Sequence, residues 1–248
     1  MTQVLLTAWI KDDTPARPRR PECPPRPRRV LCLGGDGLAT RPWTRSGFST
    51  IRSADLAHGP NDFEQVAKRH VGNVVVSFAF PSASDLSTAG ARWWKKKRAL
   101  NPNFQDDSVK KLKLLEKFLK AVGAPYCIFV PSSPTVHKKW RRPNAKISPY
   151  HYGGYLDEND AHPQHGEVIP KRDAYDAKTS LYTGNGFVVP RRKPVSPVYE
   201  ERFCKRRKKK VRISPLLAKR KHAHLRRLTP RGFVEAVARL HPGAAEGP

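Results

Sequence analysis

The sequence predicts an α/β protein with a mostly parallel sheet, a long irregular insertion and basic extensions. Short apolar runs alternate with helical segments through the first half of the chain, which is the pattern of a parallel sheet with helices on its faces. A length of 248 residues and a hydrophobic content of 38% are enough for one such domain with its own core. A formal net charge of +27 accompanies them.

The ordered domain is predicted to begin at Arg29. The preceding residues 1–28 are dominated by proline and arginine, so we expect a flexible arm there. From Arg29 an apolar strand runs into the glycines of RRVLCLGGDG, and glycine lets a backbone turn sharply beside a ligand. The candidate cofactor-binding residues of this turn are Gly34, Gly35, Asp36 and Gly37.

A second strand is predicted within STIRSADL, after a short helix over Thr40–Phe48. It ends in Asp55, which follows Gly37 by 18 positions. An acidic residue about 20 positions after a glycine turn commonly binds the ribose hydroxyls of a nucleoside cofactor. We therefore add Asp55 to the candidate cofactor residues, with a helix-capping role as the alternative.

The clearest strand covers Asn73–Phe80 and follows a short helix over Asp62–His70. A long helix is expected after Asp106, stopped by Gly123, because apolar residues recur there at helical spacing. These apolar residues are Val109, Leu112, Leu115, Phe118, Leu119 and Val122. A buried strand over Tyr126–Val130 then completes the alternation, and residues 29–143 form the predicted core.

The second half of the chain has a different composition. Residues 144–201 are rich in tyrosine, glycine and proline, and we expect an irregular segment that completes the domain. Arg202–Arg231 contains 14 lysines and arginines and no acidic residue, so residues 202–228 should be mobile until they meet phosphates. A nuclear-localisation signal would have the same composition. Residues 229–241 are predicted to form a helix that packs on the core.

Charge and cysteine content restrict the class of partner. A charge of +27 predicts a polyanion, most commonly nucleic acid. The four cysteines are widely separated, which indicates neither a disulfide framework nor a zinc site. His162 and His165 lack a cluster of further ligands, so no metal is expected. The chain has no apolar run of about 20 residues and no secretory signal, which favours an intracellular protein, nuclear if the source is eukaryotic.

Several segments, in order, resemble the small cytosine-5 DNA methyltransferase-like proteins of bacteriophages and bacterial genomes. The resemblance spans residues 29–240 and implies a Rossmann-like methyltransferase fold, with Asp55 at the ribose of S-adenosylmethionine. The segments that carry it are RRVLCLGGDG, TRPW at 40–43, IRSADLAHG at 51–59, DLSTAGARWW at 85–94, GAPYCI at 123–128, KKWRRP at 138–143, SPYHYGGYLDENDAHP at 148–163, RDAYDAKTSLYTGNGFVVP at 172–190 and TPRGFVEAV at 229–237.

The catalytic motifs of that family are altered in this chain. The family uses a cysteine thiolate in a Pro-Pro-Cys turn, but the turn here reads Pro81-Ser82-Ala83, and a methyl group is no nucleophile. Its Glu-Asn-Pro motif reads Phe129-Val130-Pro131, so an aromatic ring replaces the carboxylate. GGDGLAT also departs from the family's cofactor loop, which leaves S-adenosylmethionine binding open. The resemblance therefore implies an inactive methyltransferase homologue.

Nucleic-acid binding is the function that we expect to remain, with DNA favoured by the resemblance and RNA left open. Tryptophans beside basic residues can stack on bases, although core packing is the alternative for each of them. The candidate contacts are Arg92, Trp93, Trp94, Lys95, Lys96, Lys97, Lys139, Trp140, Arg141, Arg142, Lys205, Arg206, Arg207, Lys208, Lys209 and Lys210.

Two other functions fit the sequence. One is an active S-adenosylmethionine-dependent methyltransferase with altered chemistry on an amino group, for which no thiol is needed. Its polar residues would be Ser82, Ser84 and Asp85, in the loop after the strand over Asn73–Phe80. The other is a basic structural protein of a ribonucleoprotein particle or a virion, with its arms threaded along nucleic acid.

Overall fold

The computed structural model describes residues 28–52, 68–82, 84–204, 208–218, 225 and 228–240. Several predictions lie partly or wholly outside these residues, among them the amino-terminal arm up to residue 27, Asp55, Ala83 and the cations at 205–207. The predicted helix over Asp62–His70 is described only in its last three residues, which are helical.

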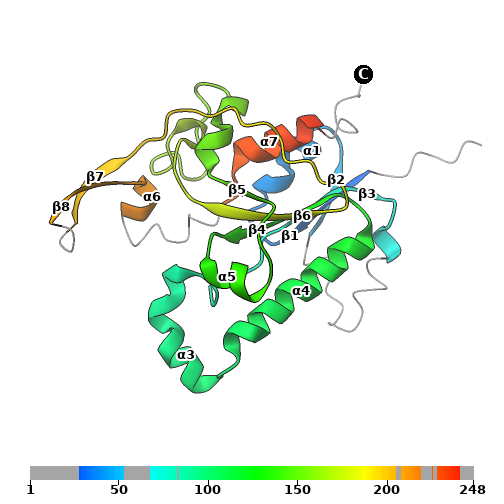
Figure 1. Cartoon of the computed structure of the whole chain (residues 1–248). Coiled ribbons are helices and arrows are strands. Elements are labelled where there is room, and N and C mark those ends of the chain that lie inside the picture. Colours follow the sequence, from blue (N-terminus) through cyan, green and yellow to red (C-terminus); the bar gives the residue numbers. More distant parts are fainter. Residues whose placement is uncertain are drawn as a thin grey trace, which may run out of the picture.

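The described elements alternate between strands and helices, as expected (Figure 1). The strands are β1 (Arg29–Leu33), β2 (Ser49–Arg52), β3 (Val74–Ala79), β4 (Tyr126–Pro131), β5 (Ala145–Ile147), β6 (Thr179–Gly184), β7 (Glu200–Cys204) and β8 (Lys209–Ile213). The α-helices are α1 (Arg41–Arg45), α3 (Trp94–Leu100), α4 (Phe104–Val122), α5 (Pro134–Lys139), α6 (Pro215–Ala218) and α7 (Arg231–Leu240). The 3-10 helices are η1 (Leu38–Thr40), η4 (Thr88–Trp93), η5 (Pro149–Tyr155) and η6 (Lys171–Asp173).

Six strands form the main sheet in the order β2-β1-β3-β4-β6-β5. The pairs β2/β1, β1/β3 and β3/β4 are parallel, whereas β6 is antiparallel to both β4 and β5. This confirms the mostly parallel α/β sheet. The strand order changes direction between β1 and β3, because β2 lies on one side of β1 and β3 on the other. Open α/β sheets bind ligands at such a switch point, outside the carboxyl ends of the strands.

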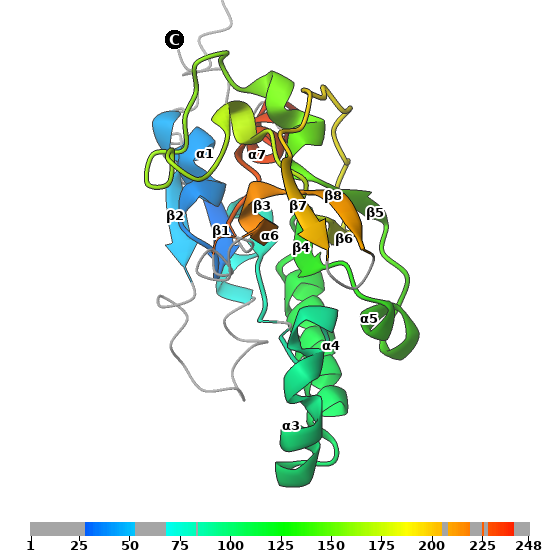
Figure 2. The ribbon, with the colours of Figure 1, turned by 90° about the vertical axis from the view of Figure 1, so that its left-hand side faces the viewer.

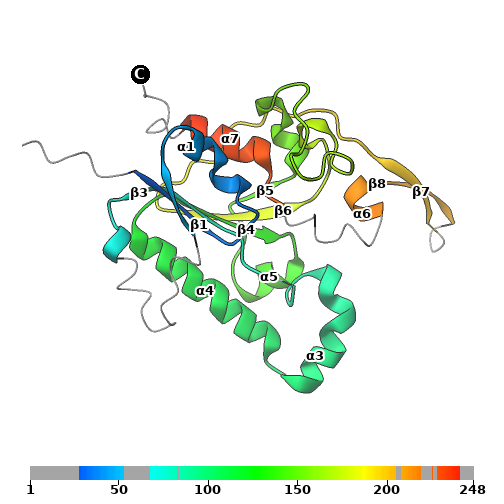
Figure 3. The ribbon, with the colours of Figure 1, turned by 180° about the vertical axis from the view of Figure 1, so that it is seen from behind.

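Helices cover both faces of the sheet. α4 lies on one face, and α1 and α7 lie on the other (Figure 3). Successive residues of β4 alternate between the two cores: Ile128 belongs to the core under α4, and Phe129 belongs to the core under α7. A strand covered on both faces needs apolar residues at every position, which explains the unbroken run in β4. None of the helices described is long and apolar enough to cross a membrane.

α4 agrees closely with its sequence pattern. It begins at Phe104, two residues earlier than Asp106, and ends where Gly123 takes a positive φ of 81°. Asp106 and Asp107 lie in the first turn, where carboxylates favour the helix dipole. The predicted apolar positions are buried, apart from the half-buried Leu115. The helix therefore supplies one complete layer of the fold.

The second half of the chain has more regular structure than its composition suggested. β5 and β6, which extend the main sheet, come from the stretch expected to be irregular. Within the segment 202–228, which we expected to be mobile until it meets phosphates, the described residues around the turn pair as the antiparallel hairpin of β7 and β8. β7 and β8 are short and bury few side chains, so no hydrophobic pattern in the sequence indicates them. Their hydrogen-bonded pairing with each other defines them as strands.

The carboxyl-terminal helix is fastened by a buried ion-pair network. The Arg231 side chain is 6% exposed and donates to Asp173 Oδ1 from Nε at 3.1 Å and from Nη2 at 2.7 Å. Its Nη1 donates to Asp160, and its backbone N–H donates to Asp173 Oδ2 at 2.9 Å. Asp173 is 1% exposed, so this network holds the start of α7 against the segment around η6.

We expect Arg231→Met to lower the free energy of unfolding by about 3–5 kcal/mol, since it leaves the Asp173 carboxylate buried without its partner. Denaturant titration measures the change. The matched control is Arg239→Met on the same helix, where the exposed side chain lies over the face of Tyr155, and a change within about 1 kcal/mol is expected. Equal effects of the two substitutions would contradict the network's role.

Candidate nucleic-acid interface

The glycine turn after β1 and the Phe80 turn after β3 meet at the switch point of the sheet. The Phe80 backbone N–H donates to the Leu33 carbonyl oxygen at 2.8 Å, which joins the two turns. Gly35 has a φ of 87°, and a Cβ placed on it would lie 2.9 Å from Phe80 Cδ2. The space beside the Gly35 backbone is therefore occupied by the Phe80 ring of the same chain, and a side chain at position 35 would clash with that ring.

Phe80 belongs to an aromatic stack that continues into the core under α7. Its ring lies parallel to Phe129, with centroids 4.5 Å apart and an interplanar angle of 12°. Phe129 in turn meets Phe233 of α7 edge-on at 5.6 Å. Phe129 is 5% exposed, so the position that the resemblance assigns to a catalytic acid is a core position in this fold.

Asp36, a predicted cofactor residue, holds the segment before α7. Its Oδ1 accepts hydrogen bonds from the Leu38 backbone N–H at 3.1 Å and from Thr229 Oγ1 at 2.7 Å. Its Oδ2 accepts from the Thr229 backbone N–H at 3.0 Å. Both oxygens are thus used within the protein, and Thr229 is 1% exposed.

The described residues at the switch point do not fit S-adenosylmethionine. The Phe80 ring covers Gly35, where the backbone would have to approach the cofactor. The carboxylate of Asp36 is taken up by Thr229. Asp55, the predicted ribose ligand, lies outside the described residues. The residues that are described therefore support no chemistry through this cofactor.

The loop after β3 is organised by Asp85 and not by a nucleophile. Ser82 is exposed, and Ser84 donates to Asp85 at 3.5 Å. Asp85 also accepts hydrogen bonds from Lys97 and from Ser108 Oγ, the latter at 3.1 Å. The hydrogen bond from Lys97 holds the pKa of Asp85 below its ordinary value. This carboxylate anchors α3 to the loop.

Neither of the buried cysteines can replace the missing thiol. Burial and the neighbouring Asp36 carboxylate raise the pKa of Cys32 to about 11, and its thiol donates to the Gly34 carbonyl oxygen at 3.2 Å. Burial also raises the pKa of Cys127 well above its ordinary value. Because the thiolate is the reactive form, both are inert core residues.

An acidic residue at position 129 should destabilise the fold. We expect Phe129→Glu to lower the free energy of unfolding by about 3–5 kcal/mol, because it removes a stacked ring and buries an unpaired charge. Phe129→Leu is the matched control, with an expected loss of about 1–2 kcal/mol. Thermal or denaturant unfolding of both variants provides the comparison. A Phe129→Glu variant as stable as the parent would show that this position tolerates a carboxylate.

η4 and α3 form a basic projection, which we call the α3 arm (88–100). None of the side chains of α3 is buried. Lys95, Lys96 and Arg98 are exposed, whereas Lys97 is ion-paired with Asp85. Trp93 is 52% exposed and has the guanidinium of Arg92 5.3 Å from its ring centroid. The arm thus presents cations and one open indole to solvent.

Two predicted nucleic-acid contacts have partners within the protein. The Trp140 ring stacks on Tyr182 of β6 with centroids 4.4 Å apart. Arg141 lies over both rings and has an Nη2 3.2 Å from Glu116. Trp140 and Arg141 are thus half-buried with partners inside the protein, and their contact with nucleic acid stays a prediction. Lys139 pairs with Asp106 at 2.7 Å, and the neighbouring Arg142 is exposed.

The second basic projection is the hairpin of β7 and β8, which we call the ribbon (200–204 and 208–213). Lys208, Lys209 and Lys210 are exposed, as is Arg212. The cross-strand register pairs Phe203 with Lys210, and Phe203 is 61% exposed. Phe203 and Arg212 were absent from the predicted site. The alternation of residues in KKVRI was the available signal for a strand, but only the pairing shows which side chains share a face.

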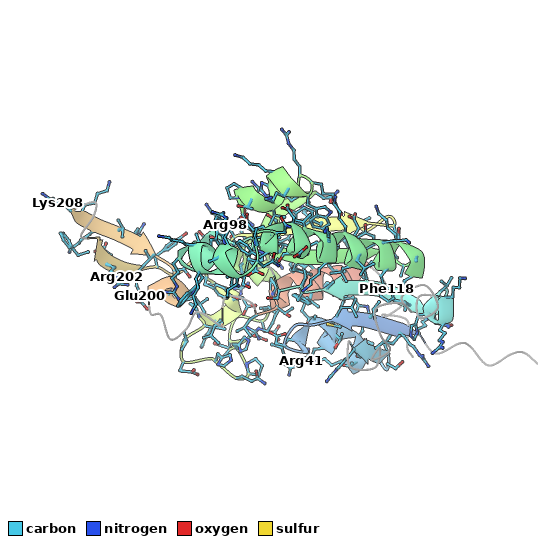
Figure 4. All side chains as sticks on the ribbon, turned by 90° about the horizontal axis from the view of Figure 1, so that it is seen from below. Arg41, Arg98, Phe118, Glu200, Arg202 and Lys208 are labelled. Carbon is cyan, nitrogen blue, oxygen red and sulfur yellow. The ribbon has the colours of Figure 1, made fainter. Side chains whose placement is uncertain are left out.

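The α3 arm and the ribbon project from the same side of the molecule. Figure 2 views this side directly, and both elements face the reader. In Figure 4, Lys208 on the ribbon lies at one end and Phe118 of α4 lies toward the opposite end, with Arg98 on α3 between them and nearer to the ribbon than Phe118 is. β3 leads into the arm and β4 leads into α5, so this is also the carboxyl side of the parallel strands.

His162 and His165 stack on each other, with ring centroids 5.2 Å apart. His162 is 3% exposed, and its Nδ1 accepts from the backbone N–H groups of Gln164 and His165. Burial and the nearby Arg231 charge lower the pKa of His162 to about 4. Within the described part of the chain, no group of three or more His, Cys, Asp or Glu could hold a metal ion.

The buried His162 predicts a loss of stability on acidification. Its pKa falls from 6.5 to about 4 on folding, so between these values the unfolded chain binds the additional proton. This contribution to stability is complete above about pH 6.5 and decreases as the pH falls toward 4. His162→Asn, which keeps an acceptor near Nδ1, should flatten that part of the curve of unfolding free energy against pH. An unchanged slope would contradict this assignment.

The structure thus brings together part of the predicted binding set. Arg92 to Lys97 lie on one projection and Lys208 to Lys210 on the other, whereas Trp140 and Arg141 are half-buried against Tyr182 and Glu116. Comparisons of the chain with models of known protein families, with curated proteins and with solved structures found no match.

Proposed function

We propose that this protein binds nucleic acid through the α3 arm and the ribbon. In this proposal it is a catalytically inactive homologue of the cytosine-5 DNA methyltransferase-like proteins, and it acts as a binding or structural component. The observation that carries the proposal is the placement of two exposed basic projections on the same side of the molecule, beyond the carboxyl ends of the parallel strands.

The positive charge of these projections exceeds the acidic charge beside it. Lys95, Lys96 and Arg98 extend from a helix that buries none of its side chains. The acidic residues of the ribbon are Glu200 and Glu201, and Glu201 pairs with Lys210 at 3.8 Å. Like charges repel one another, so these clusters are unfavourable by themselves. A bound polyanion such as nucleic acid would neutralise them.

The loss of catalysis is supported by what occupies the switch point of the sheet. Phe80 and Phe129 stack where the resemblance would place cofactor and catalytic acid, and the turn residue at 83 is alanine. A nucleophile and an acid are both required for cytosine C5 chemistry in the family that the chain resembles. Binding without methyl transfer therefore accounts for both the basic surface and the aromatic packing at the switch point.

The affinity for a labelled oligonucleotide should fall steeply as salt rises from about 0.05 to 0.3 M, because neutralised phosphates release counterions. Lys95→Ala together with Lys96→Ala should weaken binding. The slope of log affinity against log salt should become shallower by about 0.7–0.9 for each phosphate that these lysines no longer neutralise. Fluorescence anisotropy measures both quantities.

The matched control is Lys117→Ala together with Lys120→Ala, which removes the same charge from the far end of α4. Both lysines are exposed, and Lys120 pairs with Glu116. This variant should keep the salt slope of the parent. A flat salt dependence of the unaltered protein, or equal losses of affinity in the two double variants, would count against the proposed interface.

A further inference from the structure

Both basic projections carry a large aromatic side chain in solvent. Trp93 of the α3 arm is 52% exposed and Phe203 of the ribbon is 61% exposed. Single exposed apolar residues are ordinary on protein surfaces, but here each ring lies within one of the two cationic projections. The pairing of a ring with cations is therefore a feature that both projections share.

The other described tryptophans have partners inside the protein or are half-buried. Trp43 is fully buried and contacts Phe78 at a centroid distance of 5.3 Å. Trp140 stacks on Tyr182, and Trp94 is half-buried at the start of α3. Trp93 is thus the tryptophan that remains open among those described, apart from the guanidinium of Arg92 on its ring.

The surroundings of Phe203 are similar. In an antiparallel ribbon, directly opposed residues share a face, and so do residues two positions apart. The register pairs Phe203 with Lys210 and Glu201 with Arg212, which places the ring on the same face as two cations. Arg212 also lies over the Tyr199 ring at 6.0 Å. Each projection therefore offers an aromatic surface with positive charges beside it.

This combination matches the chemistry of unpaired nucleotides. Duplex bases are already stacked and paired, so a duplex is held mainly through its phosphates. A single strand exposes base faces, and a surface that binds it combines cations for the backbone with aromatic rings for the bases.

We propose that the ligand of the two projections is single-stranded nucleic acid, with unpaired bases stacked on Trp93 and Phe203. This inference rests on the proposed nucleic-acid-binding function. Phosphates would lie near Arg92, Lys95 and Lys96 on the arm, and near Lys210 and Arg212 on the ribbon.

The test compares an oligothymidylate of about 20 nucleotides with a mixed-sequence duplex of the same length, in about 0.2 M salt, on the full chain. We expect the single strand to bind at least about tenfold more tightly. Trp93→Ala and Phe203→Ala should each weaken single-strand binding by about 5- to 150-fold, which corresponds to the free energy of one base stack. Duplex binding should change by less than about twofold.

Two controls separate stacking from folding and from general apolar contact. Trp93→Phe keeps a ring, so it should retain single-strand affinity within about threefold while removing most of the tryptophan quenching on binding. Leu100→Ala removes an apolar side chain that is 80% exposed on the same arm, and its effect should stay below about twofold.

The outcomes distinguish this inference from the function on which it rests. Absence of salt-dependent binding to either probe would overturn the proposed function. If the duplex binds as tightly as the single strand, or if Trp93→Ala and Leu100→Ala have equal effects, single-strand stacking is overturned and nucleic-acid binding stands.

Discussion

The interaction on which most of this structure depends is the ion-pair network of Arg231. One guanidinium joins α7 to two carboxylates, Asp160 and Asp173, from a segment about 60 to 70 residues earlier in the chain. The nearby Asp36 side chain extends the same attachment to the glycine turn through Thr229. Buried ions are favourable only when each has its partners, so the three segments must come together as a unit. Together with the apolar contacts of Phe233, Val234 and Val237, this attachment holds α7 on the sheet face opposite α4.

This attachment helps to explain why aromatic rings pack at the switch point of the sheet. With α7 fastened over the sheet, Phe233 meets Phe129, and Phe129 stacks on Phe80. An aromatic ring at position 129 stabilises this packing, whereas a carboxylate there would be buried without a counter-ion. Phe129 is thus a residue that the packing of this face depends on.

The proposed binding surface lies where the fold has least packing. The α3 arm and the ribbon bury few side chains of their own, so their sequences are free to carry charge and exposed rings. Their common side is also the carboxyl side of the parallel strands, because β3 and β4 lead into the helices that project there. A fold whose central switch point is filled by its own side chains can still present ligand contacts from the loops around it.

The sequence by itself determined the layers of the fold, because the apolar runs of β1, β3 and β4 and the helical period of α4 are local patterns. It also determined the excess of positive charge, which is a sum over the whole composition. It also identified the altered turn and Phe129. Only the tertiary structure decided which polar and aromatic residues are available. Trp93 is open and Trp140 is stacked, although both lie close to basic residues in the sequence, and Asp36 binds Thr229, 193 positions away. The physical reason is that exposure and partnership depend on contacts between distant segments, which no local pattern encodes.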